Sequence, residues 1–147
     1  MANYCKNTLI VKGDLDQLNH FLSKVKDLNS REKFTLENIY PVPNKNLDIM
    51  ELDNWKNCEW GTTSISESNI QITNVNEASI SFISKWSPPI NWVKYVARQY
   101  GNLAFSLKYK EEEIGFYGSI HIQGYYIREF NNVSFIYSKE NYKNKIK

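Results

Sequence analysis

Apolar and polar residues follow two periods along this chain, a two-residue period in several short segments and a helical period in two longer ones. Residues 7–12 form a short β-branched run that ends at Gly13, which predicts a strand. Over residues 14–28, apolar side chains recur every three or four positions, which predicts an amphipathic helix. Asp14 can cap this helix, and Gln17 stands at capping-box spacing from it. We expect the helix to cover one face of a sheet.

The next part of the chain predicts one more strand and then a long irregular insert. Residues 34–40 have the composition of a strand, which the prolines at positions 41 and 43 terminate. Residues 41–66 mix Asn, Asp and Lys with isolated apolar side chains, and a short helix over residues 47–55 is one interpretation of part of this insert. So long a connection inside a compact domain is often functional or is anchored by its own side chains.

The second helical pattern follows Ser87-Pro88-Pro89. Ser87 is placed as an N-cap, and Pro88 falls at the first helical position, where its missing N–H is not needed. The apolar stripe continues to Tyr100, and Gly101 stands where a left-handed C-cap is expected. We therefore predict that this segment is a structural helix start.

Alternating segments before and after this helix predict hairpins. One spans residues 70–82 around a polar turn at residues 73–77. After the helix, alternation predicts strands at residues 103–109, 114–122 and 125–130, turns at residues 111–113 and 123–124, and a weaker strand at residues 133–137. The residues from 139 onward are polar and rich in Lys, as in a frayed tail.

The order of these elements predicts an α+β fold. Two βαβ units whose helices cover one face indicate a ferredoxin-like sandwich, in which an antiparallel sheet carries two helices on one side. We expect a single domain over residues 1–138, with the irregular insert at residues 41–66 and extra C-terminal hairpin strands. Residues 139–147 form the tail.

Composition narrows the classes of function. The chain has 147 residues, of which 23% are charged, and its formal net charge is only +2. This balance excludes a nucleic-acid clamp held by bulk positive charge, although it allows a local basic patch. We find no signal-peptide pattern and no stretch near the roughly 18 apolar residues of a membrane span. We expect a cytoplasmic protein with reduced thiols, no membrane contact and no cofactor.

The residues that most often perform catalysis do not form a constellation. His20 and His121 lie far apart, and neither has a Cys or carboxylate at metal-ligand spacing. Cys5 has no neighbour that would depress its pKa, so a small buried thiol is the simpler interpretation. The carboxylates at residues 111–113 predict a solvated turn or, alternatively, an acidic patch that faces a basic partner. We expect neither an enzyme nor a metal site.

Three segments resemble the Api92-like family of phage and plasmid proteins, over residues 1–124. They are MANYCKNTLIVKG at the N-terminus, EWGT at residues 59–62, and the segment from SKWSPPINW to EEEIGFYG. The resemblance implies a ferredoxin-like domain and a mobile-element context. It implies no catalytic activity. After Trp-Gly-Thr the family commonly continues with Lys-Trp-Asp-like residues, where this chain has Thr-Ser-Ile.

The aromatic residues of the insert are the candidate binding residues. Trp55, Glu59 and Trp60 lie in an acidic irregular segment, and Tyr117 lies on the outward face of a predicted strand. Rigid aromatic rings among polar groups are typical of contact hot spots. We expect a small non-enzymatic binding protein that blocks or sequesters a host protein, as a counter-defence inhibitor does.

Two other functions remain open. One is a nucleic-acid-binding module that uses the outer sheet face. The other is a nucleotide-binding protein or enzyme with a pocket between the insert and the sheet. The surroundings of the aromatic side chains discriminate among the three. Lys and Arg favour nucleic acid, a flat apolar patch favours protein, and a deep concave pocket favours a small ligand.

Overall fold

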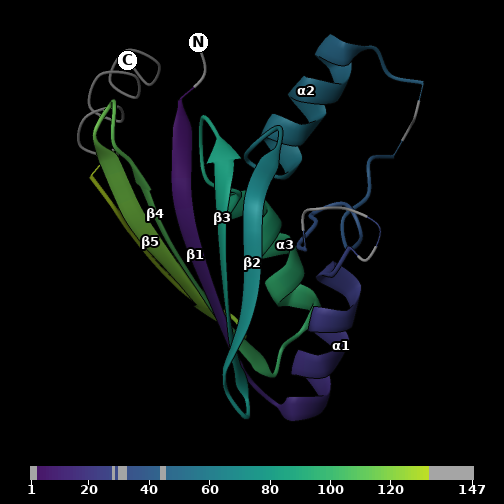
Figure 1. Cartoon of the computed structure of the whole chain (residues 1–147), viewed down its shortest axis with the longest axis vertical. Helices are drawn as coiled ribbons and strands as arrows, with labels where there is room; N and C mark the ends of the chain where they lie inside the picture. Colours follow the sequence, from purple (N-terminus) through teal and green to yellow (C-terminus); the bar gives the residue numbers. More distant parts are fainter. Residues whose placement is uncertain (1–2, 28, 30–32, 44–45, 133–147) are drawn as a thin grey trace.

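The computed structural model describes residues 3–27, 29, 33–43 and 46–132. In this part of the chain, the strands and helices form one antiparallel sheet with helices on one side (Figure 1). The strands are β1 (Tyr4–Gly13), β2 (Ile65–Asn74), β3 (Glu77–Lys85), β4 (Leu103–Glu111), β5 (Phe116–Gln123) and β6 (Tyr126–Asn131). The helices are α1 (Leu15–Val25), α2 (Ile49–Glu59) and α3 (Ile90–Gln99).

The strand order confirms the predicted α+β, ferredoxin-like fold. The sheet runs β2-β3-β1-β4-β5-β6, and every pairing is antiparallel. β1 lies at the centre, where Leu9 faces Ile80 of β3 and Leu107 of β4. The first four strands form the ferredoxin-like core, and β5 and β6 extend the sheet beyond β4, as the predicted extra hairpin strands.

The core lies between the sheet and the helices α1 and α3. α1 buries Leu18, Phe21, Leu22 and Val25, and α3 buries Trp92, Val93, Val96 and Ala97. These are the apolar stripes of the two helical patterns. The Asp14 side chain accepts a hydrogen bond from the Gln17 N–H at 3.0 Å, as the cap prediction requires. No helix in the described residues is long and apolar enough to cross a membrane.

The predicted strand at residues 34–40 is wrong. Phe34 forms one isolated bridge with Lys26, and the rest of the segment turns. Phe34 and Leu36 alternate with polar residues because both side chains are buried in the core, where each is at most 3% exposed. The Leu36 carbonyl accepts a hydrogen bond from the Trp92 indole N–H at 2.9 Å instead of joining a ladder. β2 therefore takes the place of the second strand of the fold.

The insert contains a longer helix than predicted. α2 begins at Ile49 and ends at Glu59, rather than spanning residues 47–55. Asp48 is its N-cap, and Asp48 and Glu51 form a reciprocal capping box. Local capping therefore defines the start of α2. An apolar stripe does not define it, because α2 has no fully buried residue.

The start and end of α3 differ from the prediction. The helix begins at Ile90, with Pro89 at the N-cap and no side-chain cap. The Ser87 hydroxyl donates instead to the Gly61 carbonyl, so it joins the insert to the helix start. Gly101 does not adopt a left-handed conformation, and Tyr100 is the C-cap, with φ −127° and ψ 70°.

The turn after β4 is not a solvated acidic turn, because Glu111 is buried. Its carboxylate accepts hydrogen bonds from the N–H groups of Glu113 and Ile114, at 2.8 and 2.6 Å. Glu112, in contrast, faces solvent beside Lys6. The predicted strand at residues 133–137 and the tail from residue 139 lie outside the described residues.

Candidate nucleic-acid interface

The aromatic residues of the insert pack α2 onto the rest of the domain. Tyr40 stacks on Tyr95 of α3 with ring centroids 3.8 Å apart, and Trp55 contacts Tyr40 edge-on at 5.2 Å. Trp60 is 4% exposed, and its indole N–H donates to the Tyr40 carbonyl at 2.9 Å. Trp60 is thus a core residue, contrary to the expectation of an exposed contact.

The Glu59 carboxylate accepts a hydrogen bond from the Tyr40 hydroxyl. This bond is the main reason that the pKa of Tyr40 is raised to about 12. Of the predicted contact residues, Trp55, Glu59 and Trp60 therefore lie together, and they hold the insert in place. Tyr117 lies on β5, away from these three residues. The strands β3, β1 and β4 separate β5 from β2, the strand that follows the insert.

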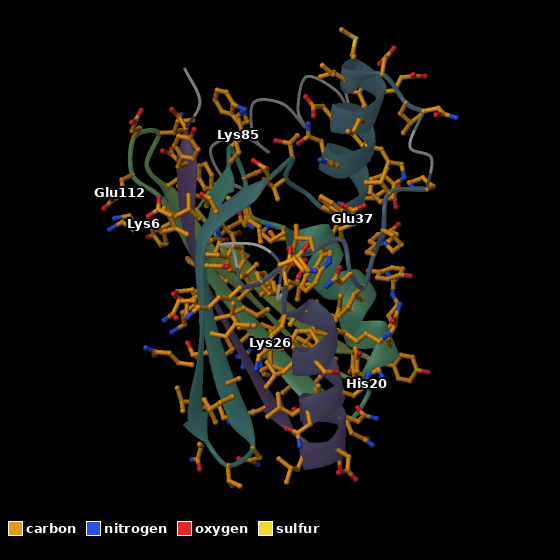
Figure 2. All side chains as sticks on the ribbon, turned by 45° about the vertical axis from the view of Figure 1, so that its right-hand side comes forward. Lys6, His20, Lys26, Glu37, Lys85 and Glu112 are labelled. Atoms are coloured by element: carbon orange, nitrogen blue, oxygen red, sulfur yellow. The ribbon has the colours of Figure 1, made fainter. Side chains whose placement is uncertain are left out.

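The face of the sheet opposite α1 and α3 is open, and its residues form rows across neighbouring strands. Figure 2 shows Lys6 and Glu112 on the side of the sheet away from His20 of α1. The register of the strands defines three rows: Tyr117-Lys110-Lys6, Phe130-Ser119-Lys108-Thr8 and Arg128-His121-Ser106-Ile10. We call this surface the open face.

Two aromatic rings of the open face lie side by side on β5 and β6. The Tyr117 and Phe130 ring centroids are 6.1 Å apart, and these residues are 47% and 55% exposed. Aromatic rings of this size are usually covered when they only support a core. They form an exposed platform on which a planar group can stack.

A shallow groove of about 370 Å³ lies beside Phe130 on the open face. Its polar walls come from β4, β5 and β6. The His121 Nδ1 atom and the Ser106 hydroxyl are hydrogen-bonded at 2.7 Å, which fixes the imidazole across the two strands. The groove is lined by Ser106, Lys108, Ser119, Ile120, His121, Arg128 and Phe130.

The cations of these three rows fall into two kinds. Lys6 and Lys110 share Glu112, at 3.3 and 3.7 Å, and Lys6 first and then Lys110 lower the pKa of that carboxyl group. Lys108 and Arg128 pair with no carboxylate among the described residues. These two side chains border the groove and are available to an anionic ligand.

Several contacts hold β6 against β5 and α3. The Asn132 side chain accepts from the Tyr117 N–H at 2.7 Å and donates to the Gly115 carbonyl at 3.0 Å. An ion pair at 2.9 Å joins Glu129 to Lys94 of α3. The platform is therefore built on a strand that is fixed at its end and at its centre.

Other groups with chemical potential have structural surroundings. Cys5 is fully buried, and burial raises the pKa of its thiol to about 12, so it is not a thiolate at neutral pH. His20 hydrogen-bonds to the Tyr100 hydroxyl at 2.9 Å. Among the described residues, no three His, Cys, Asp or Glu side chains converge to hold a metal ion.

The predicted nucleotide pocket between the insert and the sheet is small. A hollow of about 190 Å³ lies there, beside Lys56, Trp60 and Ile65. Pockets that enclose small ligands usually measure about 300–1,000 Å³. This hollow therefore supports the nucleotide-pocket alternative poorly.

A family model described as "Ferredoxin-like domain in Api92-like protein" matches residues 62–137, slightly more than half of the chain. The chain belongs to this family. The part matched by the Api92-like model contains β2, β3, α3, β4, β5 and β6, and thus both rings of the platform and both unpaired cations. Trp55, Glu59 and Trp60 precede it. Neither a search of curated proteins nor a search of solved structures finds a match.

Sequence reasoning missed Phe130, Lys108 and Arg128 as members of one site. The two-residue period already places Lys108 on the outward face of its strand. Three glutamates follow at residues 111–113, so a count of charges along the chain hides this cation. The structure turns Glu111 to the opposite side of the sheet, and Glu112 pairs with Lys6 and Lys110.

Proposed function

We propose that the chain binds single-stranded nucleic acid on the open face. The observation that carries this proposal is the exposed Tyr117–Phe130 platform beside the unpaired cations Lys108 and Arg128. Stacking of a base on an aromatic side chain is worth about 1–3 kcal/mol and requires a base that is free of its duplex partner. Cations next to the platform bind the phosphates that connect such bases.

The position of the platform gives the proposal a specific form. In the common RNA-recognition sheet, aromatic residues on the strands of a four-stranded sheet stack two or three bases. Here the platform lies on the appended strands β5 and β6, whereas the central strand β1 presents Lys6, Thr8 and Ile10 to the same side. We infer a short track across β4, β5 and β6, with one or two stacked bases.

The charges set the expected dependence on salt. Each phosphate contact with a single strand contributes roughly −0.7 to the slope of the logarithm of the association constant against the logarithm of the salt concentration. With Lys108 and Arg128 making about two such contacts, the expected slope is about −1.4. This weak slope agrees with a formal net charge of only +2. Affinity is therefore modest and depends on stacking as well as on charge.

Fluorescence anisotropy with single-stranded DNA and RNA of about ten nucleotides tests the proposal. Phe130→Ala is expected to weaken binding by about 5–150-fold, as the loss of one stacking contact implies. Lys108→Ala should reduce the salt slope by about 0.7. Lys24→Ala, an exposed lysine of α1 on the opposite side, is the matched control and should bind as the parent does.

Two results would contradict the proposal. If Lys24→Ala weakens binding as much as Lys108→Ala, then bulk charge accounts for the affinity. If neither DNA nor RNA binds at low salt, the open face has another role. Comparing the affinities for DNA and for RNA shows which of the two nucleic acids the open face binds more tightly.

A second candidate function is stoichiometric binding to a host protein through α2. Its specific support is the exposure of Ile49 and Met50, which are 80% and 74% accessible in the first turn of the helix. α2 lies beside the start of α3, where the Asn91 side chain donates to the Cys58 carbonyl at 2.9 Å, and it stands at the top of the view in Figure 1. This helix fits the counter-defence role, because exposed apolar side chains beside acidic residues resemble a contact hot spot.

Capture from nuclease-treated host lysate tests this second candidate. Ile49→Asp should abolish recovery of a specific protein without a change in urea unfolding or in oligonucleotide affinity. Recovery that persists in Ile49→Asp, or that disappears with nuclease treatment of the parent protein, argues against it.

A further inference from the structure

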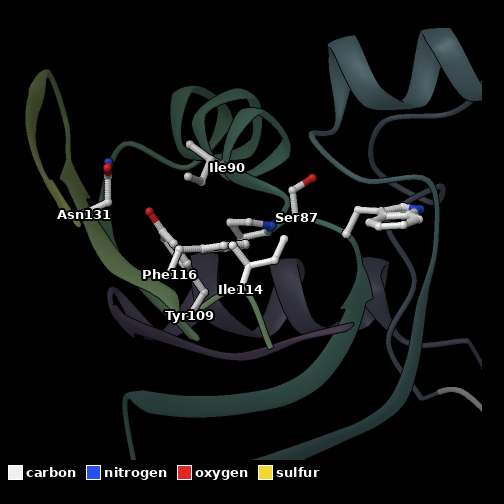
Figure 3. Close-up of a pocket in the computed structure, with 8 residues that line it drawn as sticks. Ser87, Ile90, Tyr109, Ile114, Phe116 and Asn131 are labelled. Carbon is white, nitrogen blue, oxygen red and sulfur yellow. The ribbon is translucent and has the colours of Figure 1, made fainter. Parts of the chain in front are cut away.

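Two of the hollows in the described part of the chain have similar volumes but different linings. The one in Figure 3 lies between the start of α3 and the β4–β5 turn, measures about 430 Å³ and is lined mainly by apolar side chains among the described residues. The groove of the open face measures about 370 Å³ and combines hydroxyls, an imidazole and two cations with the Phe130 ring. The groove therefore offers a ligand hydrogen bonds in addition to stacking and charge.

A nucleotide presents three parts to a protein surface: the base, the phosphate and the sugar. The platform stacks the base, and the unpaired cations Lys108 and Arg128 contact the phosphates. Neither contact distinguishes RNA from DNA, because both nucleic acids carry aromatic bases and phosphate charges. The remaining polar residues that line the groove are Ser106, Ser119 and His121. Their hydroxyl and imidazole groups are able to hydrogen-bond to a sugar hydroxyl.

The imidazole of His121 is held in the groove from two neighbouring strands. Its Nδ1 atom and the Ser106 hydroxyl of β4 are hydrogen-bonded at 2.7 Å. The Tyr126 ring of β6 lies edge-on to the imidazole, with ring centroids 6.4 Å apart. Because His121 is also half-buried, it loses little side-chain freedom when a ligand binds.

The second ring nitrogen of His121 is left for a ligand. Among the described residues, nothing hydrogen-bonds to Nε2, since the bond to Ser106 uses Nδ1. In a neutral imidazole one nitrogen donates and the other accepts. If Ser106 donates to Nδ1, then Nε2 carries the proton and donates, and if Nδ1 donates to Ser106, then Nε2 accepts. A 2′-hydroxyl both donates and accepts, so it matches Nε2 in either tautomer.

The row that contains His121 adjoins the row that contains the stacking ring. Phe130 is paired with Ser119, and His121 follows Ser119 by two residues on β5, which is roughly 7 Å along the strand. A ribose is joined directly to its base, so a base that stacks on Phe130 brings its sugar to the neighbouring part of the groove. Arg128 is paired with His121 and can contact the phosphate attached to that sugar.

We propose that the open face prefers single-stranded RNA to single-stranded DNA, and that His121, positioned by Ser106, recognises the ribose 2′-hydroxyl. The preference rests on the proposed function, because it adds one contact to the same groove. The 2′-hydroxyl is the group by which a protein distinguishes RNA from DNA at a given site. One net hydrogen bond corresponds to an affinity ratio of about 2–12.

Fluorescence anisotropy with the full chain and matched strands of about ten nucleotides tests this preference. The strands are RNA, DNA of the same bases with deoxyuridine in place of thymidine, and 2′-fluoro RNA. The 2′-fluoro strand keeps a ribose-like sugar pucker but has no hydroxyl to donate. The parent protein should bind RNA about 2–12-fold more tightly than either of the other strands.

Variants of the two histidines and of Ser106 assign the contact. His121→Phe keeps a ring of similar size and should bind RNA and DNA equally. Ser106→Ala should reduce the preference for RNA, because the imidazole loses its partner, whereas Ser106→Thr keeps the hydroxyl and should retain the preference. His20→Phe is the matched control on α1 and should bind each strand as the parent does. Urea unfolding identifies the variants that are folded.

The outcomes separate this preference from nucleic-acid binding itself. If the parent protein binds DNA as tightly as RNA or more tightly, the preference is refuted and the proposed function stands. If no strand binds at low salt, both are refuted. The role of His121 is also overturned if folded His121→Phe keeps the preference for RNA, or if 2′-fluoro RNA binds as tightly as RNA.

Discussion

Replacing Gly118 by alanine should loosen β6 from the sheet. A Cβ atom on Gly118 would meet the Phe130 carbonyl oxygen at 2.5 Å and the Asn131 Cβ at 2.6 Å. Ordinary Cβ contacts are not shorter than 3.0 Å, so β6 must move by at least about half an ångström. The Cβ would also meet the hydroxyl oxygen of the buried Tyr109, so its three nearest neighbours are a packed ring, a backbone carbonyl and a short side chain, which cannot simply rotate away.

The expected magnitude follows from two opposing terms. Overpacking of this kind costs about 1–3 kcal/mol, and the loss of glycine flexibility in the unfolded chain returns about 0.4–1 kcal/mol. We therefore expect Gly118→Ala to lower the free energy of unfolding by about 1–2 kcal/mol. In a chain of this size that is a fall of roughly 2–8 °C in melting temperature.

Urea unfolding followed by circular dichroism measures this change, and Gly101→Ala is the control. A Cβ on Gly101 meets no atom within 4 Å, so this variant should be as stable as the parent or slightly more stable. Equal unfolding midpoints for Gly118→Ala and Gly101→Ala would refute the reasoning. A folded Gly118→Ala should also bind oligonucleotides more weakly, because its shift displaces Phe130.

Four further predictions concern buried and half-buried groups. Iodoacetamide at pH 8 should label Cys58 alone in the folded protein, and both Cys58 and Cys5 in urea. Mass spectrometry counts the adducts, and two adducts without urea would contradict the burial of Cys5. Because the Cys5 thiol keeps its proton to about pH 12 in the fold but loses it near pH 9.0 when unfolded, stability should fall as pH rises above 9.0, and less steeply in Cys5→Ala. Ser87→Asp should lose about 0.5–1.5 kcal/mol in urea, since a carboxylate cannot donate to the Gly61 carbonyl, whereas a stabilised variant would favour an N-cap role. Trp60→Ala should lose about 3–5 kcal/mol and Trp55→Ala clearly less, and equal losses would mean that burial does not separate the two residues.

Elements with a regular period were predictable, and those fixed by distant contacts were not. The stripe of α1 and the alternation of β3, β4 and β5 repeat over several residues, so each determines both the element and its buried face. The apolar residues Phe34 and Leu36 alternate for another reason. They fill the space beside Trp92, and no sequence period records that a tryptophan 56 positions away takes the Leu36 carbonyl.

The candidate site was hard to predict for a similar reason. Apolar residues follow no regular period over residues 41–66. The sequence therefore does not distinguish Trp60, which is buried, from Trp55, which is half-buried. The platform depends on Phe130, whose neighbours Ser119 and Lys108 come from two other strands. Counting charges near Lys108 along the chain missed that Glu111 and Glu112 point to opposite sides of a strand end.

The central position of β1 determines when the domain can fold during synthesis. β1 leaves the ribosome before the other strands and helices of this domain, yet its partners end at Lys85 and Glu111, far along the chain. At about 5–20 residues per second, its second partner follows it by roughly 5–20 s. Until then, the apolar face of β1 lacks its neighbours, and α1 is the first element that can cover it. The amphipathic α1 thus shields the nascent N-terminal half before the sheet closes.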